Sequence, residues 1–237
     1  MTQPRIVLLH AFPLDCRMWA DVKRPLEQAG HAVSAPDLPG PEEESSLEAW
    51  ADRVLRVTDD TIVPVGCSMG GYLVFELLRR APDRLAGVGL ICTRASGETE
   101  ESRRGRDETI ELLLDEGPHA LWERMRPRLF AAGTGDDVVA LARELALEQG
   151  ATRLVAAVEA IRDRPDSTEL LARVDVPAAV VVGEEDAIAA PAEGEVLARA
   201  LPRARLHRIE EAGHLAPLER PEPVAAAILE LMEDVGA

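Results

Sequence analysis

The sequence is poor in positive charge, and all but one of its basic residues are arginines. It holds 26 basic and 43 acidic residues among 237, for a formal net charge of −17, and Lys23 is its only lysine. Phosphate backbones and anionic membrane faces are bound by clustered cations, and no such cluster is visible along the chain. We therefore expect neither nucleic acid nor a membrane among the partners of this protein.

Cysteine is also scarce, and no apolar run near the start of the chain is long. Cys16, Cys67 and Cys92 are odd in number and unrelated in spacing, which favours neither a disulfide framework nor a zinc site, so we expect no metal. The first apolar run, Ile6–Leu9, is too short for a signal peptide or a membrane span. A reducing cytoplasm is the expected location.

What the chain does contain is a regular alternation of two patterns. Hydrophobic residues make up 46% and charged residues 29%, as expected for one globular domain of ordinary size. Short β-branched runs alternate with longer helical patterns, which predicts an α/β fold with a doubly wound, mainly parallel sheet of about six strands. The expected strands are Arg5–Leu9, Ala32–Ala35, Thr61–Val65, Gly87–Cys92, Ala178–Val182 and Arg205–Ile209. Helices are expected near 18–29, 46–57, 69–80, 191–201 and 221–235.

The alternation stops once, in the middle of the chain. From about Ala95 to Arg173 no strand pattern occurs, and glycines punctuate a series of helical patterns. These patterns lie near 106–116, 118–130, 136–148 and 151–163. We interpret residues 95–170 as a helical insertion into a core formed by residues 1–94 and 171–237.

The pentapeptide Gly66-Cys67-Ser68-Met69-Gly70 stands between an expected strand and an expected helix. A G-x-S-x-G sequence at such a point is typical of a nucleophile elbow, a tight turn that holds the serine hydroxyl clear of the sheet. Small residues are needed there because side chains would collide with the neighbouring strand or helix. The alternative is a glycine-rich turn with a solvated serine, so the assignment of Ser68 as nucleophile depends on its partners elsewhere in the chain.

A serine nucleophile needs a general base, and His214 is the candidate among five histidines. It lies in a glycine-flanked loop after the last strand, at the carboxyl edge of the sheet where Ser68 also lies. Asp186, which also follows a strand, is the expected carboxylate that orients the imidazole. Glu184 and Glu185 are its rivals, but they lie nearer to the strand end. Ser68, Asp186 and His214 follow one another in the chain order expected for such a triad.

A tetrahedral oxyanion needs two backbone N–H donors. Met69, the residue after the serine, would provide one, and Phe12 in the loop after the first strand would provide the other. His10 and Ala11 lie nearer to the strand end, and Pro13 has no N–H to offer. We interpret His10 as structural support for this loop.

Several segments together carry a family resemblance. They are His10-Ala11-Phe12 with Trp19 after it, Asp37-Leu38-Pro39-Gly40, the elbow from Gly66 to Gly71, Gly183-x-x-Asp186 and Gly213-His214-x-x-x-x-Glu219-x-Pro221. With these motifs in this order, the chain resembles the α/β-hydrolase superfamily. The loop at His10 and the elbow are most similar to those of the small carboxylesterases, 3-oxoadipate enol-lactonases and cofactor-free perhydrolases. Two features depart from the family. The sequence starts at what would be the third strand, so the leading hairpin is expected to be missing or reduced. Pro41-Glu42-Glu43-Glu44 replaces the usual glycine-serine sequence.

The resemblance implies hydrolysis of an ester-like acyl bond through an acyl-enzyme on Ser68, without metal or cofactor, beneath a cap formed by the insertion. Trp122, Met125, Leu129 and Phe130 are the candidate pocket residues, although each could equally pack the cap against the core. The scarcity of aromatic residues suits a small or medium acyl group. The expected partner is therefore a small-molecule ester, lactone or thioester.

Two other classes of function use the same residues or the same fold. A C–C hydrolase or a cofactor-free perhydrolase would employ the same triad, and the sequence does not separate them from an esterase. A non-hydrolytic ligand-binding protein would not need Ser68, Asp186 and His214 all intact, which argues against it. The natural substrate and the oligomeric state do not follow from the sequence.

Overall fold

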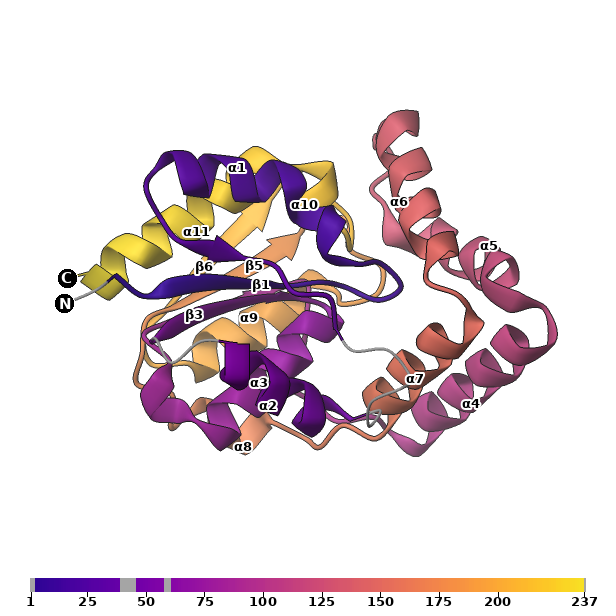
Figure 1. Ribbon diagram of the computed structural model, residues 1–237, viewed down its shortest axis with the longest axis horizontal. Coiled ribbons are helices and arrows are strands. Elements are labelled where there is room, and N and C mark those ends of the chain that lie inside the picture. The colour runs from indigo at the N-terminus through magenta and orange to yellow at the C-terminus, as the bar shows by residue number, and fades with distance from the viewer. Residues whose placement is uncertain (1–2, 39–45, 58–60, 237) are drawn as a thin grey trace.

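A parallel sheet lies at the centre of the computed structural model, which describes residues 3–38, 46–57 and 61–236. Within these residues six strands form the sheet, in the order β2-β1-β3-β4-β5-β6, and each is parallel to its neighbours (Figure 1). The doubly wound parallel sheet expected from the sequence is confirmed. The strands are β1 (Arg5–Leu9), β2 (Val33–Ser34), β3 (Ile62–Cys67), β4 (Val88–Ile91), β5 (Ala178–Gly183) and β6 (Ala204–Ile209).

Helices connect the strands, mostly where the sequence places them. They are α1 (Ala20–Gln28), α2 (Leu47–Val57), α3 (Met69–Arg80), α4 (Glu100–Asp115), α5 (Gly117–Leu129), α6 (Asp136–Glu148), α7 (Ala151–Arg162), α8 (Thr168–Leu171), α9 (Pro191–Ala200), α10 (Ala216–Glu219) and α11 (Pro221–Gly236), with 3-10 turns η1 (Cys16–Trp19) and η2 (Pro82–Arg84). The short helices α8 and α10 were not expected, because a single turn carries no measurable periodicity. The helix expected at 18–29 is preceded by η1, where the Asp15 side chain accepts a hydrogen bond from the Arg17 N–H.

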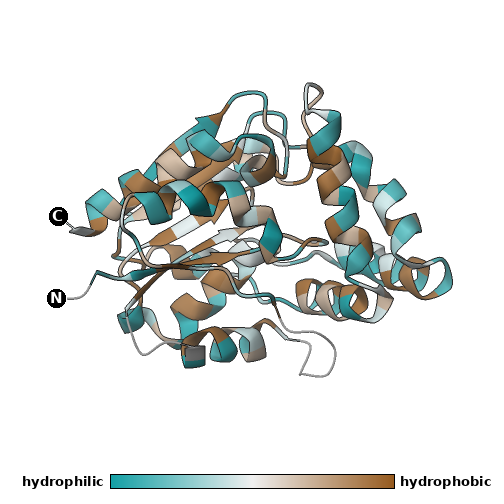
Figure 2. Cartoon of the chain, turned by 45° about the horizontal axis from the view of Figure 1, so that its top comes forward, coloured by the Kyte–Doolittle hydropathy of each residue, from teal (hydrophilic) through white to brown (hydrophobic). Residues whose placement is uncertain are grey.

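Both faces of the sheet are covered, because successive residues of a strand point to opposite sides. In β1, Ile6 and Leu8 belong to the apolar cluster that includes α1 and α11. Val7 and Leu9 belong to the cluster that includes α2, α3 and α9. Figure 2 shows hydrophobic residues concentrated along the strands and hydrophilic residues on the outer helices. The core is thus a sheet between two helical layers.

The first helix of the insertion begins earlier than the sequence pattern indicates, at Glu100 and not near residue 106. The Ser102 N–H donates to Thr99 Oγ1 at 3.1 Å, so Thr99 caps the helix. Glu100 and Glu101 then lie at the positive end of the helix dipole. These charged residues therefore favour the start of a helix at this point.

Helices α4 to α7 lie beyond the carboxyl ends of the strands (Figure 1). Residues 92–177, all of them described, contain no strand, as the sequence predicts. In this group α4 packs against α7 and α5, and α5 packs against α6. The insertion consequently lies over the edge of the sheet at which Ser68, Asp186 and His214 are expected.

Residues 39–45 lie outside the described residues, and the expectation of a remodelled Pro41–Glu44 loop therefore concerns a segment without described structure. The same holds for Pro39 and Gly40 of the Asp37 motif.

Among the helices that are described, none has both the length and the apolar character needed to cross a membrane.

Candidate active site

Ser68 stands in a sharp turn between β3 and α3. Its φ of 52° and ψ of −111° form a backbone conformation that residues other than glycine rarely adopt. A Cβ on Gly66 would lie 2.2 Å from the carbonyl carbon of Gly70, and a Cβ on Gly70 would lie 2.1 Å from the carbonyl oxygen of Leu9. Both positions therefore require glycine, as the elbow motif predicts.

Three side chains form a continuous line of hydrogen bonds at the carboxyl edge of the sheet. His214 Nε2 lies 2.8 Å from Ser68 Oγ, and His214 Nδ1 lies 2.8 Å from Asp186 Oδ2. Both His214 and Asp186 are buried. His214 follows β6, Asp186 follows β5, and parallel strands end at the same edge of the sheet. Ser68 and His214, which are 146 positions apart in the chain, therefore meet there. A proton on Nδ1 leaves Nε2 able to accept the proton of the serine hydroxyl.

Of the three acidic residues after β5, the structure brings only Asp186 to the imidazole. Its second oxygen, Oδ1, accepts hydrogen bonds from the Ile188 N–H at 2.7 Å and the Ala189 N–H at 2.9 Å. Glu184 is exposed. Glu185 is also exposed, and its carboxylate accepts a hydrogen bond from the Ala132 N–H at 2.9 Å. Asp186 is therefore held on both of its oxygens.

The two expected oxyanion donors follow neighbouring strands. Met69 is the first residue of α3, so its N–H has no partner within the helix. Phe12 lies in the loop after β1, and Leu9 at the end of β1 pairs with Gly66 at the end of β3. Among the described residues, neither N–H has a hydrogen-bond acceptor.

His10 supports the loop that carries Phe12. Its Nε2 accepts a hydrogen bond from the Leu38 N–H at 3.0 Å, and its Nδ1 donates to the Ala11 carbonyl oxygen at 3.2 Å. Burial lowers the pKa of His10 to about 4, so the ring is neutral near neutral pH. The residue has the structural position that the sequence analysis assigned to it.

Thr93 holds the elbow from the neighbouring strand, and the sequence analysis did not single it out. Its hydroxyl donates to the Ser68 carbonyl oxygen at 2.9 Å. A Cβ on Gly71 would lie 2.5 Å from this hydroxyl oxygen, so the glycine provides the space that Thr93 fills. Its place just after an expected strand, at the edge that carries the site, is the only signal in the sequence.

Glu219 anchors the loop that carries His214. One carboxylate oxygen accepts hydrogen bonds from the Gly213 N–H at 3.0 Å and the Leu215 N–H at 3.2 Å. The other accepts from the Ala131 N–H at 2.8 Å and the Thr134 hydroxyl at 2.6 Å. The carboxylate thus ties the histidine loop to the segment between α5 and α6. The motif in the sequence contains Glu219, but its role becomes visible only here.

One group of metal-ligand type lies away from the triad. Among the described residues, only Asp15, Cys16 and Asp37 bring three such atoms within 4.8 Å of one another. The Asp15 carboxylate already pairs with Arg17, and Asp37 accepts a hydrogen bond from the Cys16 N–H. Burial raises the pKa of the Cys16 thiol to about 11.

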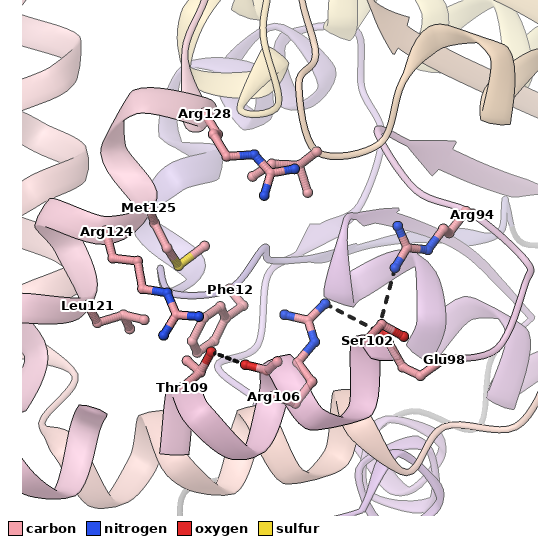
Figure 3. A pocket seen from close by; sticks show the side chains of 12 residues that line it. Phe12, Arg94, Glu98, Ser102, Arg106, Thr109, Leu121, Arg124, Met125 and Arg128 are labelled. Atoms are coloured by element: carbon pink, nitrogen blue, oxygen red, sulfur yellow. Dashed lines mark hydrogen bonds and ion pairs between the residues drawn. The ribbon is translucent and has the colours of Figure 1, made fainter. Parts of the chain in front are cut away.

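A cavity of about 290 Å³ lies between the core and the insertion (Figure 3). Its lining residues are Phe12, Arg94, Glu98, Ser102, Gly105, Arg106, Thr109, Leu121, Arg124, Met125, Arg128 and Ile188. No triad residue is among its described lining residues, but the N–H of Ile188 donates to Asp186, and Phe12 lies in the loop after β1. The volume suits a small molecule.

The chain has clear relatives. Residues 6–227 match the model of a family described as the alpha/beta hydrolase family. The chain belongs to this family. A pimeloyl-[acyl-carrier protein] methyl ester esterase from Aromatoleum aromaticum is 30% identical, and the match covers 99% of each chain.

Solved structures of other hydrolases have the same fold. A thermophilic esterase from Thermogutta terrifontis, with malate bound, is 36% identical with a TM-score of 0.94, covering 100% of this chain and 92% of that one. The enol-lactonase from Burkholderia xenovorans is 27% identical with a TM-score of 0.87, and the match covers 98% of this chain and 92% of that one. The fold and the family expected from the sequence are thereby confirmed.

In this hydrolase the expected pocket residues divide into two groups. Met125 lines the cavity, whereas Trp122, Leu129 and Phe130 do not. Trp122 and Leu129 are buried in the apolar cluster that includes α6 and α11, and the Phe130 ring meets the Trp122 ring edge-on at 6.1 Å. Their apolar surface packs the insertion against the core, which is the alternative that the sequence left open for these residues.

The polar part of the cavity wall is dominated by four arginines. These are Arg94, Arg106, Arg124 and Arg128, and among the described residues Glu98 is the only acidic one in the lining. These arginines form no cluster along the sequence, because they come from the loop after β4, from α4 and from α5. The fold gathers them in one place.

Glu98 is enclosed by arginines and has no exposed side-chain surface. Its Oε1 lies 3.2 Å from Arg106 Nη2 and 3.5 Å from Arg94 Nη2, and it also pairs closely with Arg164. Burial alone would raise the pKa of Glu98. Hydrogen bonds from Ser102 and Arg164, with the arginine charges, outweigh burial and lower the pKa to about 2. The carboxylate is therefore ionised.

Proposed function

We propose that this protein is a serine hydrolase that cleaves a small carboxylic ester, lactone or thioester through an acyl-enzyme on Ser68. The observation that carries the proposal is the line of hydrogen bonds from Asp186 through His214 to Ser68, with both N···O distances at 2.8 Å. The names of the relatives, two esterases and an enol-lactonase, support an ester bond as the target.

In the acylation step, His214 Nε2 accepts the hydroxyl proton as Ser68 Oγ attacks the substrate carbonyl carbon. Asp186 stabilises the resulting imidazolium through Nδ1–H. The oxyanion of the tetrahedral intermediate accepts hydrogen bonds from the Phe12 and Met69 N–H groups. When the intermediate collapses, Nε2–H protonates the departing alcohol or thiol, and the acyl group stays on Ser68.

Deacylation repeats these roles with water as the nucleophile. His214 takes a proton from the water molecule, which attacks the acyl-enzyme carbonyl carbon, and returns a proton to Ser68 Oγ as the acid product leaves. Every proton transfer uses a side chain of this protein, so the proposed mechanism requires neither cofactor nor metal. EDTA should accordingly leave the rate of ester hydrolysis unchanged.

The proposal assigns different tasks to the two parts of the chain. Residues 1–94 and 171–237 form the core that carries the triad. Residues 95–170 form a cap that covers the triad and selects the substrate. The position of α4 and α5 along the cavity supports this division.

The proposal is tested with Ser68→Ala and a fluorophosphonate probe. The variant should lose labelling, and kcat for p-nitrophenyl butyrate should fall by about 10⁴-fold or more. Ser34→Ala, in the edge strand β2, is the matched control and should keep both activities. Full labelling of Ser68→Ala would refute the assignment of the nucleophile.

The same measurements on the unaltered protein separate the alternatives. Labelling without turnover of any ester, thioester or lactone would indicate a C–C hydrolase or a perhydrolase. A folded protein that neither labels nor turns over substrate would indicate a ligand-binding protein.

A further inference from the structure

We propose that the cavity binds the negatively charged end of the substrate, so that the protein acts on small esters that carry a carboxylate or phosphate group. This inference rests on the proposed function, because it concerns the part of the substrate that lies away from the bond attacked by Ser68. It deepens that function by naming the charge of the substrate.

The balance of charge in the cavity wall is the first support. Within the part of the chain that the structure describes, four guanidinium groups and one carboxylate line the cavity, although the whole chain has a formal net charge of −17. A locally positive cavity in an acidic protein concentrates anions and holds them more strongly than open water would. The arginine side chain has a planar fork of donors that matches carboxylate and phosphate oxygens.

Glu98 does not neutralise this wall. Arg94, Arg106 and Arg164 all pair with the same oxygen of Glu98. Three positive charges therefore share one negative charge, and the local excess remains positive. Arg94 and Arg106 are also largely removed from solvent, with side-chain exposures of 22% and 27%, which strengthens their attraction for an anion.

Arg124 and Arg128 add two positive charges on the opposite wall. Arg124 lies 3.7 Å from Glu108, but both side chains are largely exposed, so this pair is weak. Arg128 donates a hydrogen bond to the Ala187 carbonyl oxygen, and in the described part of the chain no carboxylate pairs with it. Figure 3 shows the guanidinium groups of Arg106, Arg124 and Arg128 turned toward the middle of the cavity.

Two lining residues belong to segments next to the elbow, although Ser68 itself is not among the described lining residues. Phe12 lines the cavity with its side chain and follows the strand that is paired with β3, which leads into Ser68. Arg94 is the residue after Thr93, whose hydroxyl binds the Ser68 carbonyl oxygen. The proposal therefore places the reactive carbonyl group of a small ester at Ser68 and its anionic group among the arginines.

The test compares two methyl esters that differ only in this charge. Monomethyl glutarate has a carboxylate where methyl pentanoate has a methyl group, and released methanol reports both rates. We expect a higher kcat/KM for monomethyl glutarate. The double variant Arg124→Gln/Arg128→Gln should lower the ratio of the two kcat/KM values by about ten-fold or more, since it removes charge-assisted hydrogen bonds.

A matched control comes from the same helix. Arg126 lies on α5 between the two altered residues, is exposed and does not line the cavity. Arg126→Gln should leave the ratio unchanged, which separates a specific site from the general loss of a positive charge. The two altered arginines lie on α5, and neither of them pairs with Glu98, so the ion pairs of Glu98 remain intact.

Two inhibitors distinguish a carboxylate from a phosphate. Glutarate and inorganic phosphate are each tested against the hydrolysis of methyl pentanoate, and the stronger inhibitor identifies the group. Inhibition should weaken in Arg124→Gln/Arg128→Gln. Equal inhibition of the double variant and the unaltered protein would contradict the inference.

The outcomes keep this inference apart from the proposed function. If fluorophosphonate labelling and methyl pentanoate hydrolysis persist while the double variant keeps the original ratio, the anion site is refuted and the serine hydrolase stands. If neither labelling nor hydrolysis of either ester occurs, the proposed function fails and this inference fails with it.

Discussion

Single residues hold the reacting groups of the site through contacts that leave little freedom. Ser68 keeps its unusual φ because Gly66 leaves room for the backbone of Gly70 and because Gly70 admits the close approach of Leu9 in β1. Thr93 also binds the Ser68 carbonyl oxygen. Asp186 divides its two oxygens between the imidazole and the N–H groups of its own loop. A carboxylate held in this way fixes both the position and the tautomer of His214.

The first prediction at this scale concerns the choice of acid. Asp186→Asn should lower kcat for p-nitrophenyl butyrate by about 10⁴-fold, because an amide can present a donor to Nδ1 and stabilise the wrong tautomer. Glu184→Gln should have no effect on kcat, since Glu184 is exposed. A loss in Glu184→Gln comparable to that in Asp186→Asn would show that the orienting acid has been misassigned.

At the scale of elements, the short helix α10 connects the histidine loop to the insertion. Its last residue, Glu219, accepts four hydrogen bonds from the two loops. The backbone adds to this connection, because the N–H groups of His214 and Leu215 both donate to the Leu129 carbonyl oxygen. His214, the proposed general base, is therefore positioned partly by the insertion.

Glu219→Gln tests this connection. The glutamine amide has one acceptor oxygen in place of two, so two of the four donors lose their partner inside the protein. We expect the free energy of unfolding to fall by about 3 kcal/mol. We also expect kcat to fall, because His214 is less well held, and urea unfolding with steady-state kinetics measures both. Glu222→Gln, an exposed residue of α11, is the control and should change neither.

At the scale of the whole molecule, the two chain segments that join the insertion to the core are bound to each other. The Ser167 N–H donates to the Ala95 carbonyl oxygen at 2.8 Å, and the Gly97 N–H donates to Asp166 Oδ2 at 2.8 Å. The pair of Glu98 and the buried Arg164 links the same two segments. Insertion and core are therefore expected to unfold together.

The acid stability of the protein should reveal this link. The pKa of Glu98 is lowered to about 2 in the folded protein, so below its ordinary value of 4.5 the unfolded chain binds the proton more readily. The stabilisation by Glu98 is complete above about pH 4.5 and is lost as the pH falls toward 2.

The variant Glu98→Gln makes this prediction specific. Near neutral pH it should be less stable than the unaltered protein by about 3 kcal/mol, because buried arginines lose their counter-charge. The difference should shrink as the pH approaches about 2.5. Urea unfolding at the two pH values measures it, with the exposed Glu100→Gln as the control. A difference that does not depend on pH would contradict the role of the Glu98 charge.

Local patterns in the sequence were sufficient for the elements of the core. The strand Arg5–Leu9 and the helix at 69–80 lie where the periodicity places them. The glycines of the elbow predict the turn that the structure contains. They can do so because the steric limits of a tight turn act over only a few residues. Capping signals act over the same short range. The cap at Thr99 starts α4 in a segment that has no apolar face.

The sequence by itself determined the alternating α/β order, the parallel sheet and the edge at which Ser68, Asp186 and His214 stand, because each depends on hydrophobic periodicity or on the direction of the chain. Only the tertiary structure decided that Glu219 holds the histidine loop, that Met125 and not Trp122 lines the cavity, and that four scattered arginines converge there. These features depend on the distances between segments far apart in the chain, and packing sets those distances.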